Sequence, residues 1–333
     1  MDLSTNYLGF ELPHPLVAGA SPLVDDLGMV RRLEDAGAAA IVMHSLFEEQ
    51  IDGERRATFA HRDAVAESYG EATTFFPPAS EFALGPDAYL ERIRAIKAAV
   101  SVPVIASLNG TTPSGWLRYA GLIEEAGADA LELNVYEIAT DPVKTGESLE
   151  RRLLEVVRAT RSSVEIPIAV KLSPFYSSLA NLAREIVLAG ANGLVVFNRF
   201  YQPDIDPEKL EHAPILHLSD SSELLLRLHW LAILSGRVET SLAASGGVHS
   251  SLDALKAVMA GAHAVQMVSA LLQHGPERLG AVRDGLATWL EEHDYRSLRE
   301  AQGSMSFSRC PDPAALERGN YMRVLGSWRP DKL

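Results

Sequence analysis

Cysteine and long apolar runs are scarce in this sequence. The chain of 333 residues contains one cysteine, Cys310, which excludes a disulfide framework and a metal site built from several cysteines. The richest apolar run, residues 224–234, is interrupted by Arg227 and His229 and falls short of the roughly 18 apolar residues that a membrane-spanning helix needs. The N-terminus has no basic start followed by an apolar stretch and does not resemble a signal peptide. We therefore expect a cytoplasmic protein that does not enter a membrane.

Positive charge is in deficit as well. The 30 Lys and Arg residues against 44 Asp and Glu residues give a net charge of −14, and such a chain lacks the basic surface that binds nucleic acid or anionic lipid. The ten histidines show no HExxH pattern or other recurring ligand spacing, so we predict no metal site. Apolar residues at 47% and charged residues at 22% are typical of an ordinary globular protein.

A short phrase, Ala-Gly-Ala, recurs along the chain. It occurs four times, at residues 36–38, 126–128, 189–191 and 260–262. Each copy follows a segment with a helical pattern and precedes a short apolar run, as expected where a glycine ends a helix and the chain enters a buried strand. The repeated helix–glycine–strand unit predicts parallel strands that are joined by helices.

Four more apolar runs complete a set of eight predicted strands, centred near residues 18, 41, 105, 132, 169, 195, 242 and 265. Helices are predicted at residues 25–35, 86–99, 114–126, 148–162, 178–188, 221–234, 251–259 and 276–292. Eight alternating units predict a (β/α)8 TIM barrel over residues 1–302. A doubly wound open sheet is the alternative, but the GxGxxG turn that it would favour after an early strand is missing.

Three segments lie outside these eight units. Residues 3–12, broken at Gly9, predict a β-hairpin that closes the bottom of the barrel. Residues 45–85 form an insertion between the second strand and the next helix, and it is long enough to be a functional loop or a small lobe. Residues 303–333 form a C-terminal extension with a predicted helix at residues 314–325, and we expect the extension to pack on the barrel or on a partner subunit.

Polar residues stand at the ends of three consecutive predicted strands. They are Asn134, Lys171 and Asn198, and His44 ends an earlier strand. Singly, such residues are more often solvated turn residues. Because active sites of (β/α)8 barrels lie at the carboxyl ends of the strands, three together predict a site. A lysine there suits developing negative charge, and the two amides suit a planar polar ring.

The last two strands predict a phosphate site. The seventh ends in Gly246-Gly247, the eighth ends in Val268-Ser269, and a helix N-terminus is expected in the loop that follows the eighth. Backbone N–H groups from such a loop and helix start bind phosphate in many barrels, without a cationic side chain. The small residues that end the first strand, 18–20, would let a flat ligand approach the backbone. A plain turn is the alternative for each of these segments.

These strand-end motifs resemble those of the dihydroorotate dehydrogenases, FMN-dependent (β/α)8 flavoproteins, and especially their soluble class 1 branch. The likeness runs from the N-terminal hairpin to about residue 293. It is carried by residues 15–20 (PLVAGA), 132–134 (ELN), 170–174 (VKLSP), 197–198 (FN), 245–248 (SGGV) and 267–271 (MVSAL).

The resemblance implies FMN as cofactor, the oxidation of dihydroorotate to orotate in pyrimidine biosynthesis, and a homodimer. It places Lys171 beside the N1–C2=O edge of the flavin, and Asn134 and Asn198 against a pyrimidine-like substrate. His44, from its place at a strand end, is expected to be a further substrate contact. The residues that it implies for the cofactor are Ala18, Gly19, Ala20, Ser45, Ser107, Asn134, Lys171, Gly246, Gly247, Val268 and Ser269.

The sequence also departs from the family pattern. Glu137 stands where the family has the Cys or Ser that removes the substrate proton, and Met43, next to His44, stands at the position of a family lysine. An asparagine of the long second loop is replaced among residues 75–77, and a Gly-rich stretch after the sixth strand is replaced by residues 217–220. We expect the flavin half of the site to be kept and the substrate half to be changed. Glu137 would be the base if apolar surroundings raise its pKa, and otherwise it is a solvated loop residue.

Two other functions fit the same residues. The barrel could be a flavin-free lyase or isomerase of a phosphorylated substrate that uses Lys171. It could also be a flavin electron-transfer subunit with an iron–sulfur partner, whose cluster would lie in the partner because this chain has one cysteine. For the leading hypothesis, an FMN-dependent oxidoreductase acting on CH–CH bonds, the expected catalytic residues are Lys171, Glu137 and Asn134.

Overall fold

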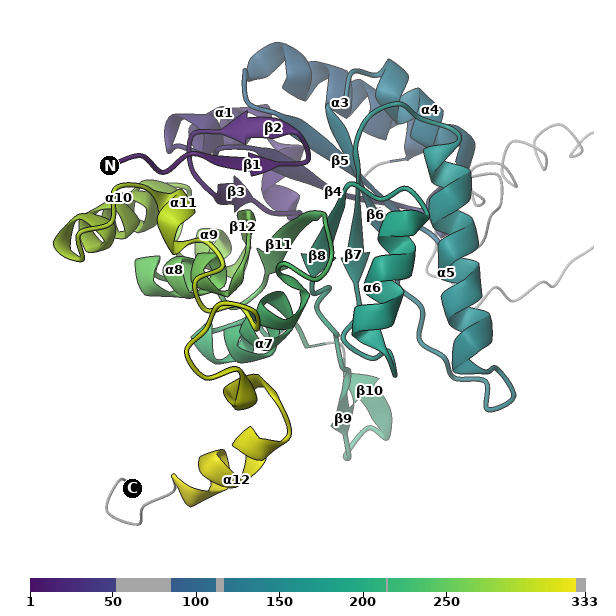
Figure 1. Cartoon of the computed structure of the whole chain (residues 1–333). Helices are drawn as coiled ribbons and strands as arrows, with labels where there is room; N and C mark the ends of the chain where they lie inside the picture. The colour runs from purple at the N-terminus through teal and green to yellow at the C-terminus, as the bar shows by residue number, and fades with distance from the viewer. Residues whose placement is uncertain (52–84, 112–116, 214, 328–333) are drawn as a thin grey trace, which may run out of the picture.

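A closed barrel of eight parallel strands forms the centre of the molecule (Figure 1). The computed structural model describes residues 1–51, 85–111, 117–213 and 215–327. Around the barrel the strands follow the order β11-β12-β3-β4-β5-β6-β7-β8, so the predicted (β/α)8 fold is confirmed. The strands are β3 (Leu16–Ala18), β4 (Ile41–Phe47), β5 (Val104–Asn109), β6 (Ala130–Asn134), β7 (Ile168–Leu172), β8 (Gly193–Val196), β11 (Ser241–Ser245) and β12 (Ala264–Met267).

Helices surround the barrel at the predicted places. They are α1 (Leu27–Asp35), α3 (Pro86–Ala99), α4 (Leu117–Glu125), α5 (Gly146–Arg161), α6 (Leu179–Leu188), α7 (Leu224–Leu234), α8 (Ser251–Ala260) and α10 (Arg278–Glu292). The glycine of each Ala-Gly-Ala phrase has a positive φ, from +92° at Gly37 to +123° at Gly261. A side chain is strained in that conformation, which explains why glycine stands where each helix turns into the next strand.

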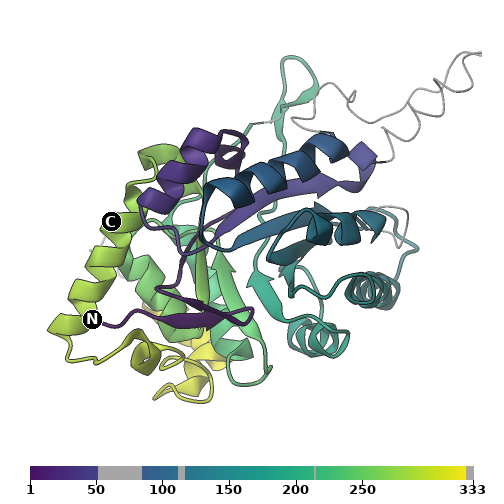
Figure 2. The ribbon, with the colours of Figure 1, turned by 90° about the horizontal axis from the view of Figure 1, so that it is seen from above.

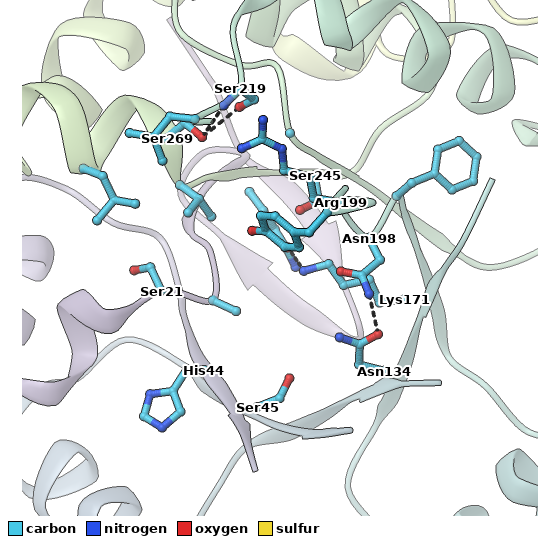
Figure 3. Close-up of a pocket in the computed structure, with 18 of the residues that line it drawn as sticks. Ser21, His44, Ser45, Asn134, Lys171, Asn198, Arg199, Ser219, Ser245 and Ser269 are labelled. Carbon is cyan, nitrogen blue, oxygen red and sulfur yellow. Dashed lines mark hydrogen bonds between the residues drawn. The ribbon is translucent and has the colours of Figure 1, made fainter. Parts of the chain in front are cut away.

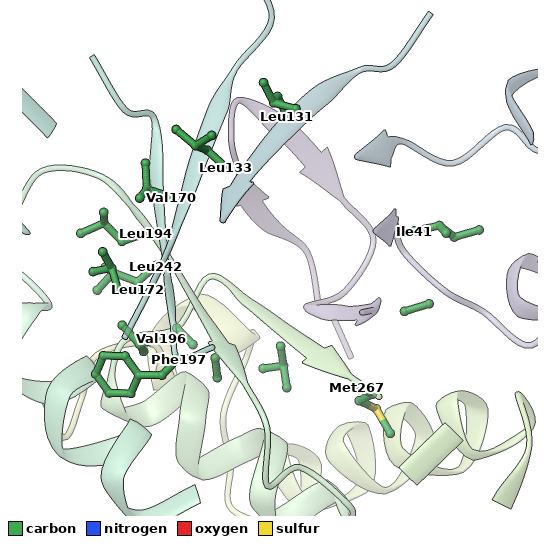
Figure 4. Packing of buried hydrophobic residues seen from close by; sticks show 14 of the residues in the cluster. Ile41, Leu131, Leu133, Val170, Leu172, Leu194, Val196, Phe197, Leu242 and Met267 are labelled. Atoms are coloured by element: carbon green, nitrogen blue, oxygen red, sulfur yellow. The ribbon is translucent and has the colours of Figure 1, made fainter. Parts of the chain in front are cut away.

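Apolar side chains fill both faces of the barrel strands. Leu131, Val170, Leu194 and Leu242 belong to the outer layer, between the strands and the helices, where Figure 4 shows them. Alternate residues face inward, and at the N-terminal ends of the strands they pack against the hairpin of β1 (Thr5–Tyr7) and β2 (Phe10–Leu12). The predicted hairpin at the bottom of the barrel is therefore confirmed (Figure 2).

Several short elements differ from the predictions. β4 runs to Phe47, so His44 lies inside the strand rather than at its end. A small hairpin of β9 (Asp204–Asp206) and β10 (Glu211–Ala213), and two short helices, α9 (Ser269–His274) and α11 (Leu298–Ala301), were not predicted as elements. Such short segments carry too few residues for a clear periodic pattern.

The C-terminal extension begins on the barrel. The backbone N–H groups of Met305 and Phe307 donate to the carbonyl oxygens of Met259 in α8 and Ala232 in α7, at 2.8 Å each. The predicted helix at residues 314–325 divides into a 3-10 turn, η4 (Pro313–Leu316), and α12 (Gly319–Gly326). In Figure 1, α12 stands apart from the helices of the barrel.

Most of the predicted long insertion, residues 52–84, lies outside the described residues, and so do the substitutions expected at residues 75–77. In the part of the chain that the structure describes, no helix combines the length and the apolar character needed to cross a lipid bilayer.

Candidate active site

A cavity of about 520 Å³ opens at the carboxyl ends of the barrel strands. Its volume lies in the range of about 300–1,000 Å³ that is usual for small-molecule and cofactor sites. Figure 3 shows its polar side chains converging from several strands and loops. The predicted site residues that line it are Ala20, His44, Ser45, Asn134, Lys171, Asn198, Gly246, Gly247, Val268 and Ser269.

A buried network of charged and polar groups forms the floor of the cavity. Lys171 Nζ lies 3.2 Å from Glu132 Oε1 and 3.5 Å from Gln266 Oε1, and Gln266 Nε2 donates to Glu132 Oε2 at 2.6 Å. Lys171 is 8% exposed and the other two residues are 1% exposed. Because a buried charge is costly unless it is paired, Glu132 and Gln266 are what allow a lysine at this depth.

Sequence reasoning did not assign a role to Glu132 or Gln266. Each is a polar residue inside a short apolar run, LELN in β6 and VQM in β12. Both stand at inward-facing strand positions. A polar residue at such a position is the signal that could have identified them.

Asn134 and Asn198 lie side by side at the ends of β6 and β8. Asn198 Nδ2 donates to Asn134 Oδ1 at 2.9 Å (Figure 3). Asn134 is paired with Lys171 in the register of β6 and β7, and the N–H of Asn198 donates to the carbonyl oxygen of Leu172 at 2.7 Å, so both amides lie near the lysine. The remaining donors and acceptors of these amides are available to a ligand with alternating polar atoms.

An irregularity in β4 presents His44 and Ser45 to the cavity. The register between β4 and β5 shifts between Val42 and Ser45. The buried Tyr89 of α3 holds this shift, because its hydroxyl lies 3.0 Å from the carbonyl oxygen of His44 and accepts from the N–H of Ser107 at 2.9 Å. Burial raises the pKa of Tyr89, so its hydroxyl keeps its proton.

The bulge also decides which serine reaches a ligand. Ser45 lines the cavity, whereas Ser107 lies behind it with its Oγ 2.8 Å from Ser45 Oγ. The side chain of Met43 is fully buried in the outer layer of the core. At the position where the resemblance implies a lysine, this chain therefore has a core residue, and the neighbouring His44 lines the cavity.

His44 is held close to a carboxylate. Its Nδ1 lies 3.2 Å from Asp25 Oδ1, which ends the 3-10 turn η1 (Pro22–Asp25), and its ring packs edge-to-face on Tyr89 at 5.6 Å. Burial lowers the pKa of His44 and Asp25 opposes that effect. The lowered pKa favours the neutral imidazole, which is the state that accepts a proton.

The opposite end of the cavity carries N–H and hydroxyl groups. Ser219 Oγ lies 2.8 Å from Ser269 Oγ. The N–H of Gly247 donates to Ser219 Oγ at 3.4 Å, and the N–H of Ser219 donates to Ser269 Oγ at 3.0 Å. Donors gathered in this way suit an anion such as a phosphate group. Ser219 was not predicted as a site residue, and it lies in the segment 217–220, where the resemblance implies a Gly-rich stretch.

Glycines allow the close backbone packing at this end of the cavity. Gly247 has a φ of +81°, and a Cβ on it would lie 2.4 Å from the backbone nitrogen of Leu224. A Cβ on Gly19, at the end of β3, would lie 2.7 Å from Val268 Cγ2. Ala18 and Gly19 support the cavity from behind, and Ala20 reaches its surface.

Glu137 lies elsewhere. It lines a second cavity of about 710 Å³ between the loops that follow β6, β7 and β8. There its Oε1 is 2.9 Å from Arg152 Nη2 and 3.5 Å from Lys144 Nζ. The structure does not bring Glu137 into the cavity with Lys171 and Asn134, and the arginine on α5 explains where its side chain goes.

Taken together, these features define a (β/α)8 barrel protein with a ligand cavity at the carboxyl ends of its strands. A family model described as dihydroorotate dehydrogenase matches residues 82–290. This protein belongs to the dihydroorotate dehydrogenase family, which is a family of oxidoreductases.

Individual relatives are similar at low identity. "Putative dihydroorotate dehydrogenase A (fumarate)" of Aeropyrum pernix is 32% identical over 213 residues, which cover 61% of this chain and 67% of the relative. The catalytic subunit of "Dihydroorotate dehydrogenase B (NAD(+))" of Pyrococcus abyssi is 27% identical over 313 residues, covering 90% and 98%. The protein of the same name from Methanothermobacter thermautotrophicus is 26% identical over 310 residues, covering 90% and 97%.

Proposed function

We propose that this protein is an FMN-dependent oxidoreductase that transfers a hydride between a CH–CH bond of a small planar, pyrimidine-like substrate and FMN. The observation that carries this proposal is the pairing of a buried lysine at the floor of the cavity with an anion-binding end built from Gly247, Ser219 and Ser269. A cationic group beneath a flat ligand and donors for its phosphate are the two requirements of an FMN site.

The residues of the cavity fit this cofactor. Gly246, Gly247, Val268 and Ser269 would hold the phosphate, and Ala20 and Ser45 would lie against the flat ring system. Lys171 would face the ring edge that gains negative charge, with Glu132 and Gln266 fixing its position. FMN, when bound, supplies a reversible hydride acceptor.

On the substrate side we assign a proton-accepting role to His44. Oxidation of a CH–CH bond removes a hydride from one carbon and a proton from its neighbour, so a base must stand on the substrate side. His44 lines the cavity, has a pKa that burial lowers toward the neutral form, and contacts Asp25, which would orient its ring. Glu137, bound to Arg152 and Lys144, would instead hold the loop that follows β6.

We further propose that dihydroorotate is a poor substrate. The Cys or Ser base of the family is absent, and no carboxylate among the described residues lining the cavity takes its place. Each hydrogen bond that a buried polar substrate loses costs about 1–3 kcal/mol, so two missing contacts would reduce binding by about a hundredfold. The substrate would then be a related small molecule with a reducible or oxidisable CH–CH bond.

The decisive experiment measures the cofactor and its reduction. We expect the purified protein to release FMN, and not FAD, on acid treatment. In anaerobic stopped-flow mixing with dihydroorotate, other dihydropyrimidines and NAD(P)H, we expect dihydroorotate to bleach the flavin slowly and another donor to bleach it faster. A colourless protein would favour the flavin-free lyase or isomerase. Full bleaching by millimolar dihydroorotate within seconds would overturn the proposed difference in substrate.

The names of the similar relatives bear on assembly. Several are catalytic subunits, which implies that those proteins work with further subunits. We propose a homodimer for this chain, with an iron–sulfur electron-transfer protein as a further partner whose cluster is bound outside this chain. Light scattering at micromolar concentrations that gives a monomer mass would contradict the homodimer, and co-purification of an iron-containing protein would support the partner.

A further inference from the structure

The anion-binding end of the cavity carries a cation that neither the sequence motifs nor the family resemblance implied. Arg199 follows Asn198 in the loop after β8 and lines the cavity, and its side chain is 21% exposed. Figure 3 shows it directed toward Ser219 and Ser269, away from Asn134. The phosphate site thus has a guanidinium group facing its backbone and hydroxyl donors.

Neighbouring groups fix the position of this guanidinium. Arg199 Nη2 lies 3.2 Å from Glu223 Oε1, in the 3-10 turn η3 (Ser221–Glu223). The ring of Tyr201 lies below it, 5.5 Å from the guanidinium carbon. A side chain held from two sides loses little freedom when it binds a ligand.

The carboxylate that holds Arg199 is itself shared. Glu223 Oε2 lies 3.7 Å from Nη2 of the buried Arg227, and Arg227 Nη1 also bonds the carbonyl oxygen of Glu223 at 2.7 Å. Arg227 packs behind Gly246, where an added Cβ would meet its Nη2 at 2.9 Å. Glu223 therefore bridges the two arginines, and its one contact with Arg199 Nη2 leaves the other N–H donors of Arg199 for a ligand in the cavity.

We propose that Arg199 binds the phosphate monoester of the cofactor and makes cofactor retention depend on that phosphate. The inference rests on the proposed function. The planar fork of an arginine gives two parallel hydrogen bonds to phosphate oxygens, while Gly247, Ser219 and Ser269 donate from the other side. The site then recognises FMN by charge as well as by backbone donors, and it discriminates against riboflavin, which has the same ring system and no phosphate.

The test is the affinity of the flavin-free protein for FMN and for riboflavin, measured by quenching of flavin fluorescence. In Arg199→Gln we expect FMN binding to weaken about ten- to hundredfold, the value of one or two charge-assisted hydrogen bonds, with riboflavin binding unchanged. Arg199→Met, which keeps the apolar stem over Tyr201, should behave in the same way. It serves as a second test if the glutamine variant does not fold. Arg199→Lys should lose less, because it keeps the charge and lacks the fork.

Arg94 provides a matched control. It is an exposed arginine on α3 that pairs with Glu91, so Arg94→Gln removes the same charge from a site away from the cavity and should leave both affinities unchanged. If the ratio of FMN to riboflavin affinity is the same in Arg199→Gln, Arg199→Met and the unmodified protein, the inference is overturned while the proposed function stands. If the unmodified protein binds neither flavin, both are overturned together.

Discussion

At the end of the barrel where the strands begin, Tyr7, Leu8 and Leu12 of the hairpin pack onto the small inward-facing residues of the strands. At the other end, the same alternation of side chains presents Glu132, Lys171 and Gln266, which bond to one another. One end is closed by apolar contacts and the other is open and lined by polar groups. Apolar packing closes the end where the strands begin, and the open, polar end is where the active sites of (β/α)8 enzymes typically lie.

Two histidines, the buried His14 and the half-buried His44, make the contrast concrete. His14, at the closed end, accepts a hydrogen bond from the N–H of Leu16, and burial lowers its pKa to about 4. His44, at the open end, contacts Asp25 and also has a pKa lowered by burial. The same physical cause should therefore give a pH dependence of stability at one end and a pH dependence of catalysis at the other.

The largest effect is expected from Gly246→Asp. Gly246 has a φ of +94°, and the new carboxylate would stand against an anion-binding site, so flavin retention should be lost. Flavin absorbance per protein after gel filtration measures it. Gly319→Asp is the control, because a Cβ there has no neighbour within 4 Å. Retained flavin in Gly246→Asp would mean that the phosphate lies elsewhere.

Next in size is the effect of His44→Asn on catalysis. Loss of a general base costs about 10²–10⁴ in rate, so anaerobic flavin reduction by the best donor should slow by that factor. In the unmodified protein the rate should rise with pH and level off at a lower pH than for an ordinary histidine, because the neutral imidazole is the active form and burial lowers its pKa. Glu137→Gln should change the rate little. A large loss in Glu137→Gln and none in His44→Asn would reverse the assignment.

At the closed end, Leu12→Ala should affect folding alone. Leu12 is 2% exposed and packs under the barrel, and removing such a side chain costs about 2–4 kcal/mol of unfolding free energy. Urea denaturation measures the loss, and the affinity of the folded protein for FMN should stay unchanged. A changed affinity would show that the two ends are coupled through the strands.

The smallest effect concerns His14 and acid. Its pKa of about 4 in the folded protein lies below the ordinary value of 6.5, so the unfolded chain binds the proton more tightly. Stability from this group is present above pH 6.5 and is lost as pH falls toward 4, by about 2 kcal/mol at pH 5. His14→Asn, which keeps an acceptor for Leu16, should reduce the difference in unfolding free energy between pH 7.5 and pH 5. An unchanged difference would contradict the assignment.

The strands and helices could be predicted because each unit carries its own signal. The glycines of the Ala-Gly-Ala phrases have the positive φ that ends a helix, and the apolar runs that follow them are the buried strands. Asn134, Lys171 and Asn198 could be predicted as one group, since parallel strands place their carboxyl ends at the same edge. These patterns are local. Because the strand–helix unit repeats around the barrel, each pattern also predicts where its residues lie in the structure.

Three features of the site could not be predicted in this way. The partnership of Glu132 with Lys171 and Gln266 depends on residues far apart in the chain meeting inside a closed barrel. The direction of Arg199 depends on Glu223, in a loop with no periodic pattern. The position of the Glu137 side chain depends on Arg152, which lies in α5 beyond the loop that contains Glu137. In each case the position of one side chain depends on a partner that is distant in the chain. The sequence contains both residues but does not show that they are in contact.

The floor of the cavity has a consequence for how the protein would be assembled. Lys171 is paired with Glu132 within the barrel itself, so its positive charge is compensated even when no ligand is bound. A buried lysine without that carboxylate would oppose folding until an anion arrived. The barrel can therefore fold without a bound ligand and bind the ligand afterwards. A protein from which the ligand has been removed should remain folded and should bind the ligand again.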